Sequence, residues 1–312
     1  MRSSQLHRNR PLENLSVAYK PEGMIADILS PKFPVKHESD TFYVYAKDTM
    51  SLPETIRADG AESNQATFNV TTSSYVLTEH ALHDDVTDRQ RKNADMAIKP
   101  EIDVTEDLMR KIQIRREVDL MGLIQTPLNW GNVTSLTSTL AWSQNTTLSN
   151  PITLLDSVSS VVLQQSGKNP NVLALADASY KSAKEHISVL DRIKYTSPDS
   201  VTPQLMARLF GVNTVAVSQA IRYTGEEGIA ETTTSQSFIM TDTAFLAYIE
   251  PIPKLKMVSA LTTFWSNDGG SEVIVKKWRE EKLGADRIEA SVMFQHRAIA
   301  SDAAALIVNT NQ

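Results

Sequence analysis

The chain of 312 residues contains no cysteine. Disulfide bonds, thiolate nucleophiles and cysteine-ligated zinc are therefore excluded, and any extra stability must come from packing or association. The chain also lacks an apolar run approaching the ~20 residues that a membrane span needs. Its first residues include Arg2, Arg8 and Arg10 but no apolar stretch follows them, so no secretory signal is indicated. We expect synthesis and folding in a cytosol, and no membrane partner.

Motifs for nucleotide-dependent or hydrolytic chemistry are also missing. No G-x-G-x-x-G or G-x-S-x-G occurs, and Gly167-Lys168 lacks the upstream glycine and downstream hydroxyl of a phosphate loop. The formal net charge of −6 argues against an affinity built chiefly on phosphate neutralisation, although it leaves a locally basic surface open. Arg2, Arg8 and Arg10 are such a surface or simply a frayed terminus. The sequence predicts no cofactor.

A few polar clusters would carry chemistry only if the fold brought them together. His80 and His83 precede Asp84 and Asp85. At the end of a predicted strand this spacing fits no standard metal template, and solvated side chains are the better interpretation. The tryptophans are too dispersed to form a stacking platform for single-stranded nucleic acid; they are Trp130, Trp142, Trp265 and Trp278. We predict no metal site.

Other titratable side chains have a structural interpretation beside a catalytic one. His186 lies on a predicted helix and His296 in a predicted strand, where packed or surface histidines are commoner than general bases. Glu226 and Glu227 lie between two glycines, where paired carboxylates could bind a cation or transfer a proton, although an ordinary acidic loop is the commoner case. We assign no catalytic residue.

The composition that is present, 41% hydrophobic and 22% charged, is typical of a soluble globular protein with one large domain or two modest ones. Thr41–Ala46 and Ala66–Leu77 are predicted strands joined by a long polar stretch that contains Pro53 and Gly60. An isolated two-stranded ribbon is marginal in water. The ribbon therefore packs on its own domain or across another copy of the chain, and the segment alone favours the first.

Pro100 starts a predicted helix over Glu101–Ile124, with acidic residues first and basic residues later, as the helix dipole favours. Val104, Leu108 and Ile112 begin an apolar stripe, and about 24 residues would span roughly 36 Å. The helix is a candidate structural spine or an ordinary long amphipathic helix, and these residues do not distinguish the two.

Residues 125–149 are predicted to be loop with one short strand, and a compact region of alternating helices and strands follows. Asn150 and Pro151 start a helix that Gly167 ends, and Asp177 starts a single helix through Leu190. The other elements of this region are a helix at Pro203–Phe210 and strands at Val172–Ala176, Val212–Val217, Ser237–Met240 and Ala244–Ile249. The alternation indicates a small α/β subdomain with a covered sheet.

The C-terminal part of the chain changes to long predicted strands, Val258–Trp265, Val273–Lys282 and Arg287–Arg297, separated by turn residues. This pattern predicts an antiparallel meander, closed by an apolar segment over Ala298–Val308. A chain that passes from ribbon to long helix, α/β region and meander is typical of one mixed domain interrupted by another.

This order of segments resembles the major capsid proteins of tailed double-stranded DNA phages, which have the Hong Kong 97-type fold. The similarity covers most of the chain and is one of pattern more than of any invariant motif. Asn14–Val35 resembles the amino-terminal arm, Thr41–Leu77 the extended E-loop and Glu101–Ile124 the spine helix of the peripheral domain. The segments that resemble the axial domain are NVLALADASYKSAKEHISVLDRIKY (171–195), LMARLFGVNTVAVSQAI (205–221) and FIMTDTAFLAYIEP (238–251), while RIEASVMFQHRAIASDAAALIV (287–308) resembles the return of the peripheral domain.

The resemblance implies an α+β fold with an arm at 1–40, an E-loop at 41–82, a peripheral domain at 83–148 whose spine helix is 101–124, an axial domain at 149–257 and a peripheral return at 258–312. It implies a structural protein, not an enzyme, that assembles as hexamers and pentamers into an icosahedral shell around double-stranded DNA, with weak non-specific DNA contact. Separate scaffold and portal proteins are the expected partners, and Met1 favours a separate scaffold over a cleaved precursor. The expected location is the virion capsid, with assembly in the host cytoplasm.

Two other hypotheses stay open. An encapsulin-like compartment shares this fold but would carry an inward groove for cargo peptides, which the sequence does not locate. An α/β hydrolase or transferase would act through Glu226, Glu227 or His186. Some members of the family cross-link a loop lysine to a distant asparagine; Lys47 lies near the ribbon, but no pattern identifies its partner, so no cross-link is predicted.

Overall fold

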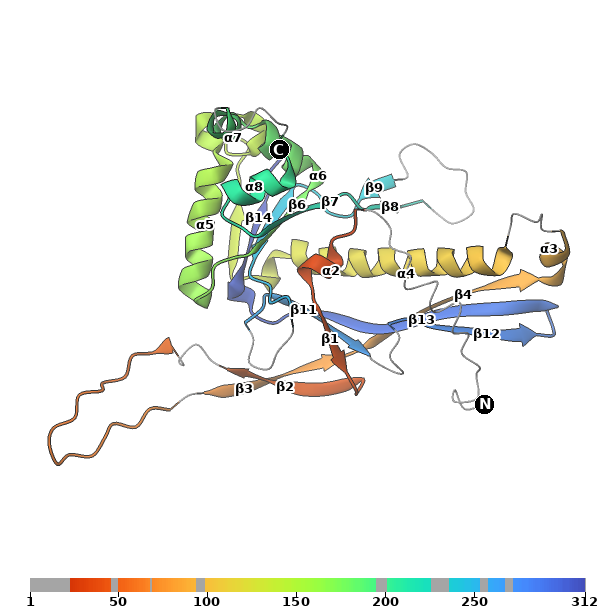
Figure 1. Cartoon of the computed structure of the whole chain (residues 1–312), viewed down its shortest axis with the longest axis horizontal. Coiled ribbons are helices and arrows are strands. Elements are labelled where there is room, and N and C mark those ends of the chain that lie inside the picture. The colour runs from red at the N-terminus through yellow and green to blue at the C-terminus, as the bar shows by residue number, and fades with distance from the viewer. Residues whose placement is uncertain are drawn as a thin grey trace.

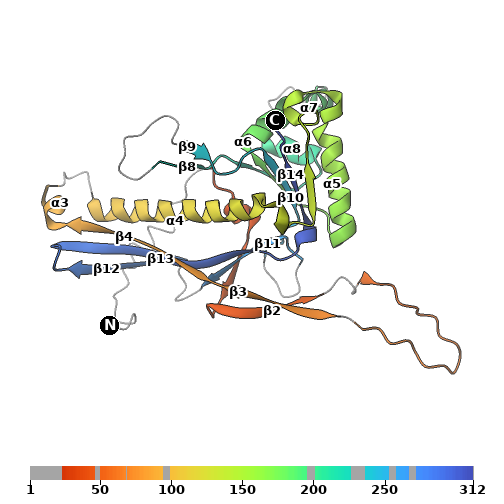
Figure 2. The same ribbon diagram turned by 180° about the vertical axis from the view of Figure 1, so that it is seen from behind.

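The computed structural model describes residues 23–45, 50–67, 69–93, 99–194, 201–225, 236–252, 258–266 and 272–311. Figure 1 shows an elongated molecule built along one helix, α4 (Pro100–Gln125), with a long sheet beside it and a compact, helix-covered sheet at its carboxyl end. A two-stranded ribbon leaves the long sheet and reaches past the compact part, as the view from behind in Figure 2 also shows.

The helix α4 begins at Pro100, whose missing N–H suits the first turn of a helix, and the acidic Glu101 lies in that turn. Leu108 and Ile112 pack on the long sheet, whereas Ile124 packs at the compact end. The helix predicted over residues 101–124 is confirmed, with one residue added at each end. One buried side of α4 therefore joins the two parts of the molecule.

The long sheet has five strands: β1 (Lys32–Val35), β11 (Leu261–Ser266), β13 (Ala285–Ala298), β12 (Ile274–Glu280) and β4 (Thr78–Thr87). The central strand is β13, which pairs antiparallel with β4, β12 and β11. The predicted meander is wrong in its order, because β11 and β12 each pair with β13 and not with each other. Apolar alternation indicates a strand and its buried face but does not identify the neighbouring strand.

The predicted antiparallel ribbon consists of β2 (Ser39–Tyr45) and β3 (Val70–Val76). At its root, Tyr75 stacks on Phe264 of β11 with ring centroids 4.6 Å apart, and the Phe42 ring lies 5.4 Å from the same centroid. The strand β3 is followed after one residue by β4 of the long sheet. The ribbon is thus anchored at its base to its own chain.

The compact part contains a second five-stranded sheet in the order β5, β14, β10, β6 and β7, which are Asn132–Ser135, Ala304–Val308, Thr243–Ala247, Val172–Ala176 and Thr214–Ser218. Every residue of β6 and β10 is buried, as expected of a covered sheet. Helices of the same part are α5 (Pro151–Ser166), α6 (Asp177–Glu185), α7 (Ile187–Ile193) and α8 (Pro203–Leu209). The strands β5 and β14 come from ranges assigned above to the peripheral domain, yet both extend this sheet.

The local signals of the compact part are correct for α5 and wrong at two other places. The Asn150 side chain caps α5, and Gly167 ends it with a φ of +70°. The single helix predicted from Asp177 is instead two helices, because His186 has an extended ψ of 135° and accepts the Ser188 N–H as the cap of α7. The segment predicted as a sheet strand at 237–240 does not join the sheet: β9 (Gln236–Phe238) pairs with β8 (Ile221–Tyr223) in a separate ribbon.

The remaining elements are short: α2 (Ala26–Leu29), α3 (Asp88–Asn93), and the 3-10 turns η3 (Pro127–Asn129), η4 (Trp142–Gln144), η5 (Thr147–Ser149) and η7 (Ser301–Ala303). None of the helices in the described part of the chain is long and apolar enough to cross a membrane.

Candidate assembly interface

The loop between β2 and β3 projects furthest from the body of the molecule (Figure 1). Every described residue of this loop, 50–67, is exposed, and Gly60 supplies a positive φ of +75° for its turn. Its large apolar side chains are exposed as well, Leu52 to 94% and Ile56 to 82%. The loop is mostly polar, but it carries these exposed apolar side chains on the part of the molecule that projects furthest, which makes it a candidate contact surface.

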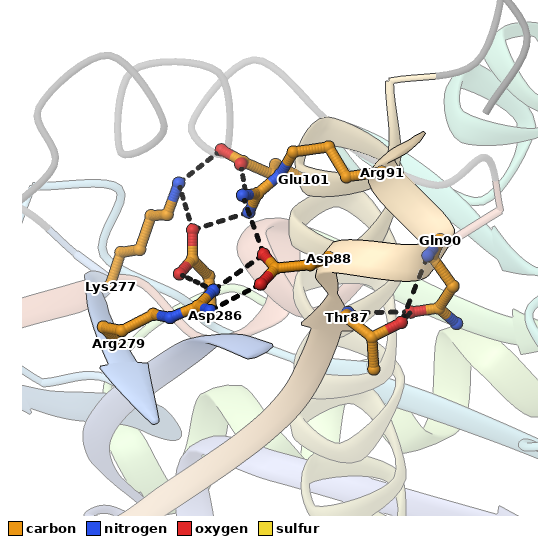
Figure 3. Close-up of polar contacts among 8 residues, drawn as sticks. All are labelled: Thr87, Asp88, Gln90, Arg91, Glu101, Lys277, Arg279 and Asp286. Atoms are coloured by element: carbon orange, nitrogen blue, oxygen red, sulfur yellow. Dashed lines mark hydrogen bonds and ion pairs between the residues drawn. The ribbon is translucent and has the colours of Figure 1, made fainter. Parts of the chain in front are cut away.

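A network of ion pairs closes the opposite end of the molecule, where α3 and the start of α4 meet the hairpin of β12 and β13 (Figure 3). Its acidic and basic members are Asp88, Arg91, Glu101, Lys277, Arg279 and Asp286. Asp286 lies at the centre and accepts from Arg91 at 2.5 Å and Arg279 at 3.2 Å, with the Lys277 ammonium 3.4 Å away. The network therefore ties four elements together at this end.

The network depends on Asp286 staying ionised. Burial opposes the charge of this carboxylate, but hydrogen bonds from Arg91, Arg279 and Lys277 outweigh burial and hold the pKa of Asp286 below its ordinary value. Around it, Lys277 also donates to Glu101 at 2.6 Å, and Arg279 donates to Asp88 at 2.5 Å. Several charges in one network make a stronger connection than isolated surface pairs.

The sequence alone does not predict this network, because its members come from segments that lie far apart in the chain. A signal was present in the hairpin: Arg279 and Asp286 are cross-strand partners, symmetric about the turn that Gly284 closes with a φ of +57°. The contribution of α3 and α4 is not visible in the same way, because it depends on how distant segments meet.

The two histidines weighed as general bases are packed side chains. His186 is completely buried, with Nε2 3.0 Å from the Ser149 hydroxyl and Nδ1 2.7 Å from the Ser188 hydroxyl. Nδ1 of His296 lies 2.8 Å from the Thr263 hydroxyl, and burial together with Arg116 lowers the pKa of His296 to about 3. Both rings form part of the fold.

The structure separates the residues that were weighed as a metal cluster. His80 and His83 are three residues apart in β4, and because successive side chains alternate across a strand they point to opposite faces of the sheet. The His80 ring stacks on Phe294 at 4.6 Å, while Asp85 accepts two hydrogen bonds from Arg287 at 2.6 and 2.7 Å. No group of three or more metal-ligating side chains occurs in the ranges that the structure covers.

Of the remaining residues singled out in the sequence, some lie within the described part of the structure and some lie outside it. Gly167 ends α5, and the Lys168 ammonium lies 5.6 Å from the centroid of the Tyr248 ring, so this pair has a structural role. Three of the tryptophans are buried and scattered: Trp130, Trp142 and Trp265. Arg2, Arg8, Arg10, Lys47, Glu226 and Glu227 lie outside the described residues.

The amino-acid sequence is similar to those of known proteins over about two thirds of its length. No protein-family model matches the chain. The chain is 27% identical over 213 residues to the major capsid protein of Burkholderia phage BcepMu, covering 67% of this chain and 68% of the relative. It is 25% identical over 215 residues to the major capsid protein of Pseudomonas phage JBD67, covering 67% of each.

Solved structures extend the likeness to almost the whole chain. A phage-related protein from Bordetella bronchiseptica RB50 matches with a TM-score of 0.76 and 18% identity over 98% of both chains. The capsid of cyanophage P-SCSP1u matches with a TM-score of 0.60 and 10% identity over 95% of this chain and 90% of that one. The SrpI encapsulin of Synechococcus elongatus PCC 7942 matches with a TM-score of 0.52 and 13% identity over 98% of this chain and 96% of that one.

The spine helix, the two sheets and the projecting ribbon, together with these neighbours, define an α+β protein with the Hong Kong 97-type capsid fold. Among proteins with this fold, the chain is a homologue of phage major capsid proteins.

Proposed function

We propose that the chain assembles as hexamers and pentamers into an icosahedral shell that encloses double-stranded DNA, and that it catalyses no reaction. The observation that carries this proposal is the projecting loop with its exposed Leu52 and Ile56, which has no apolar cover within its own chain among the described residues. Contact with another copy would cover it. Repeated heterologous contacts of this kind close rings, and many modest interfaces give a stable container.

Each part of the chain then has a place in the shell. The arm comprises residues 1–40 and the E-loop residues 41–82. The peripheral domain comprises 83–148, with the spine helix, and 258–312, while the axial domain comprises 149–257 and takes β5 and β14 into its sheet. Axial domains meet around the five-fold and six-fold axes, and peripheral domains and E-loops join neighbours. Separate scaffold and portal proteins act during assembly in the host cytoplasm, and contact with DNA is weak and non-specific.

Electron microscopy and light scattering of the purified chain test this proposal, with and without co-expression of a candidate scaffold gene. We expect closed shells roughly tens of nanometres across, or rings of five and six subunits, because many modest contacts add up to a stable assembly. A chain that stays a monomer or dimer under every condition would contradict it.

A second candidate function is a cellular compartment, which the match to the SrpI encapsulin favours. The two candidates differ in what the shell contains. Nuclease-resistant double-stranded DNA inside particles from the natural source supports the capsid, whereas particles filled with protein and free of DNA support the compartment.

A further inference from the structure

Residues 23–31, here called the strap, run between the two sheets across α4 (Figure 1). At one end the Gly23 carbonyl accepts the N–H of Gln219, one residue beyond β7, at 3.2 Å. At the other end the Pro31 carbonyl accepts the N–H of Thr263 in β11 at 3.0 Å. The strap therefore contacts the compact sheet region, the helix and the long sheet in turn.

Glu117 of α4 holds the middle of the strap. Its side chain is 0% exposed, and its two carboxylate oxygens accept the N–H groups of Ile25 and Ala26, each at 3.0 Å. These amides lie at the start of α2, where the first N–H groups have no partner within the helix. The adjacent Arg116 forms an ion pair with Asp27 of the strap at 2.7 Å. One turn of α4 thus binds both the backbone and a side chain of the strap.

Apolar packing makes the strap part of the junction between the two parts of the molecule. Ile25 and Leu29 belong to one buried cluster that also contains Leu120 of α4, Phe245 of the compact sheet and Leu261 of the long sheet. Because protein interiors are close-packed, moving the strap would change how these elements meet.

We propose that Glu117 is a positioning residue that fixes the strap and, through it, the angle between the compact sheet and α4. The inference rests on the proposed shell function, in which this angle sets the curvature of the particle. A small change of angle in each copy is repeated at every contact and alters whether and where a shell closes. A carboxylate suits the role because its two acceptor oxygens match two N–H donors on adjacent residues.

The test is Glu117→Gln in the full chain. The glutamine oxygen accepts one N–H, but its own amide N–H faces the second donor, so one buried amide loses its partner. Hydrogen exchange at Ile25 and Ala26 before assembly should accelerate about tenfold or more. After assembly, particles of the variant should be heterogeneous in diameter under conditions where the unsubstituted chain gives closed particles of one diameter.

The matched control is Glu106→Gln, the same change at a half-buried position of the same helix, which should leave both exchange and diameter unchanged. Unchanged exchange in Glu117→Gln would overturn the contact, and faster exchange with unchanged diameters would overturn the role in curvature. If the unsubstituted chain forms no closed particles, the proposed function fails and the curvature role fails with it, whereas the exchange result still decides whether Glu117 holds the strap.

A second variant tests the strap from its other end without altering Glu117. Gly23 has a φ of +78°, and a Cβ at this position would lie 3.1 Å from the Gln219 backbone. Gly23→Ala should therefore loosen the strap and also broaden the particle diameters. If the backbone amides of the strap exchanged hydrogen faster in this variant but its particles still had one diameter, the proposal would be contradicted, even if Glu117→Gln failed to fold.

Discussion

His296 and Asp286 show two ways in which this chain encloses a titratable side chain. The His296 ring is 9% exposed and packs beside Phe294, with a hydroxyl as its hydrogen-bond partner. Asp286 is held by three cationic side chains at one end of β13, the central strand of the long sheet. Burial favours the neutral form of the His296 ring, and the three cations favour the ionised form of Asp286. Protonation of either group in acid therefore opposes the folded arrangement.

Acid should destabilise the fold through His296. Burial and the nearby Arg116 lower the pKa of His296 to about 3, against an ordinary value of 6.5. Below pH 6.5 the unfolded chain binds a proton that the folded chain does not bind, so stability falls as the pH drops toward 3, by about 2 kcal/mol at pH 5. Urea unfolding at pH 7 and pH 5 checks this: His296→Gln should lose this part of the pH dependence, and the exposed-site control His37→Gln should keep it. Equal pH dependence in all three proteins would refute it.

Asp286→Asn should weaken the network at the end of the hairpin. It removes a charged acceptor from three cations, which predicts a loss of about 1–3 kcal/mol near neutral pH. Because the folded pKa of Asp286 lies below the ordinary 3.8, its contribution is present above that value and lost as the pH falls through the folded pKa. Unfolding measured at pH 7 and pH 3 should therefore show the variant approaching the unsubstituted chain in acid. Glu281→Gln, in the exposed turn of the same hairpin, is the control and should change little; a similar loss from both variants would contradict the central role of Asp286.

At the scale of single elements, α5 illustrates a helix whose ends are set by local side chains. The Asn150 side chain accepts the N–H groups of Ile152 at 3.0 Å and Thr153 at 3.4 Å, which otherwise have no partner in the first turn. At the other end, Gly167 adopts the left-handed conformation, and its N–H donates to the Leu163 carbonyl at 2.8 Å. Both signals are local, so they act wherever the helix packs.

Asn150→Ala should therefore destabilise the chain by about 1 kcal/mol through loss of the cap. Urea unfolding of the unassembled chain measures the loss, with Gln164→Ala at an exposed position of the same helix as the control. The control should be neutral or slightly stabilising, because alanine has the highest helix propensity. If the two variants had the same stability, the cap would contribute nothing.

Elements of this local kind are the ones that the sequence allowed us to predict. The bounds of α4 and α5 follow from Pro100, Asn150 and Gly167, and the ribbon follows from alternation. The order of β11, β12 and β13 could not be obtained in the same way, because strand pairing depends on contacts between distant segments. The break at His186 is not predicted by helix propensity, because the His186 ring caps α7 by accepting the Ser188 N–H and is also held by a hydrogen bond with Ser149, far away in the sequence.

The middle of the molecule is tightly packed, whereas its projecting loop is exposed. One buried cluster joins α4 to strands of both sheets, whereas the loop at 50–67 is exposed along its entire described length. A protein that folded only for itself would gain nothing from large apolar side chains on its furthest projection. The shape thus separates a part that fixes the fold from a part available for contact with another copy.

Leu52→Asp with Ile56→Asp should abolish assembly without unfolding the chain. Both side chains are almost fully exposed, so the change removes few contacts within the chain and thermal unfolding of the unassembled protein should stay the same. In an interface, the same change would bury two unpaired carboxylates, which is strongly unfavourable. The control Ser63→Asp with Gln65→Asp adds the same charge to exposed positions of the same loop and keeps its apolar side chains. Size-exclusion chromatography and electron microscopy should show shells from the control and only small oligomers from the first variant; shells from both would mean that the apolar side chains of this loop make no essential contact between copies.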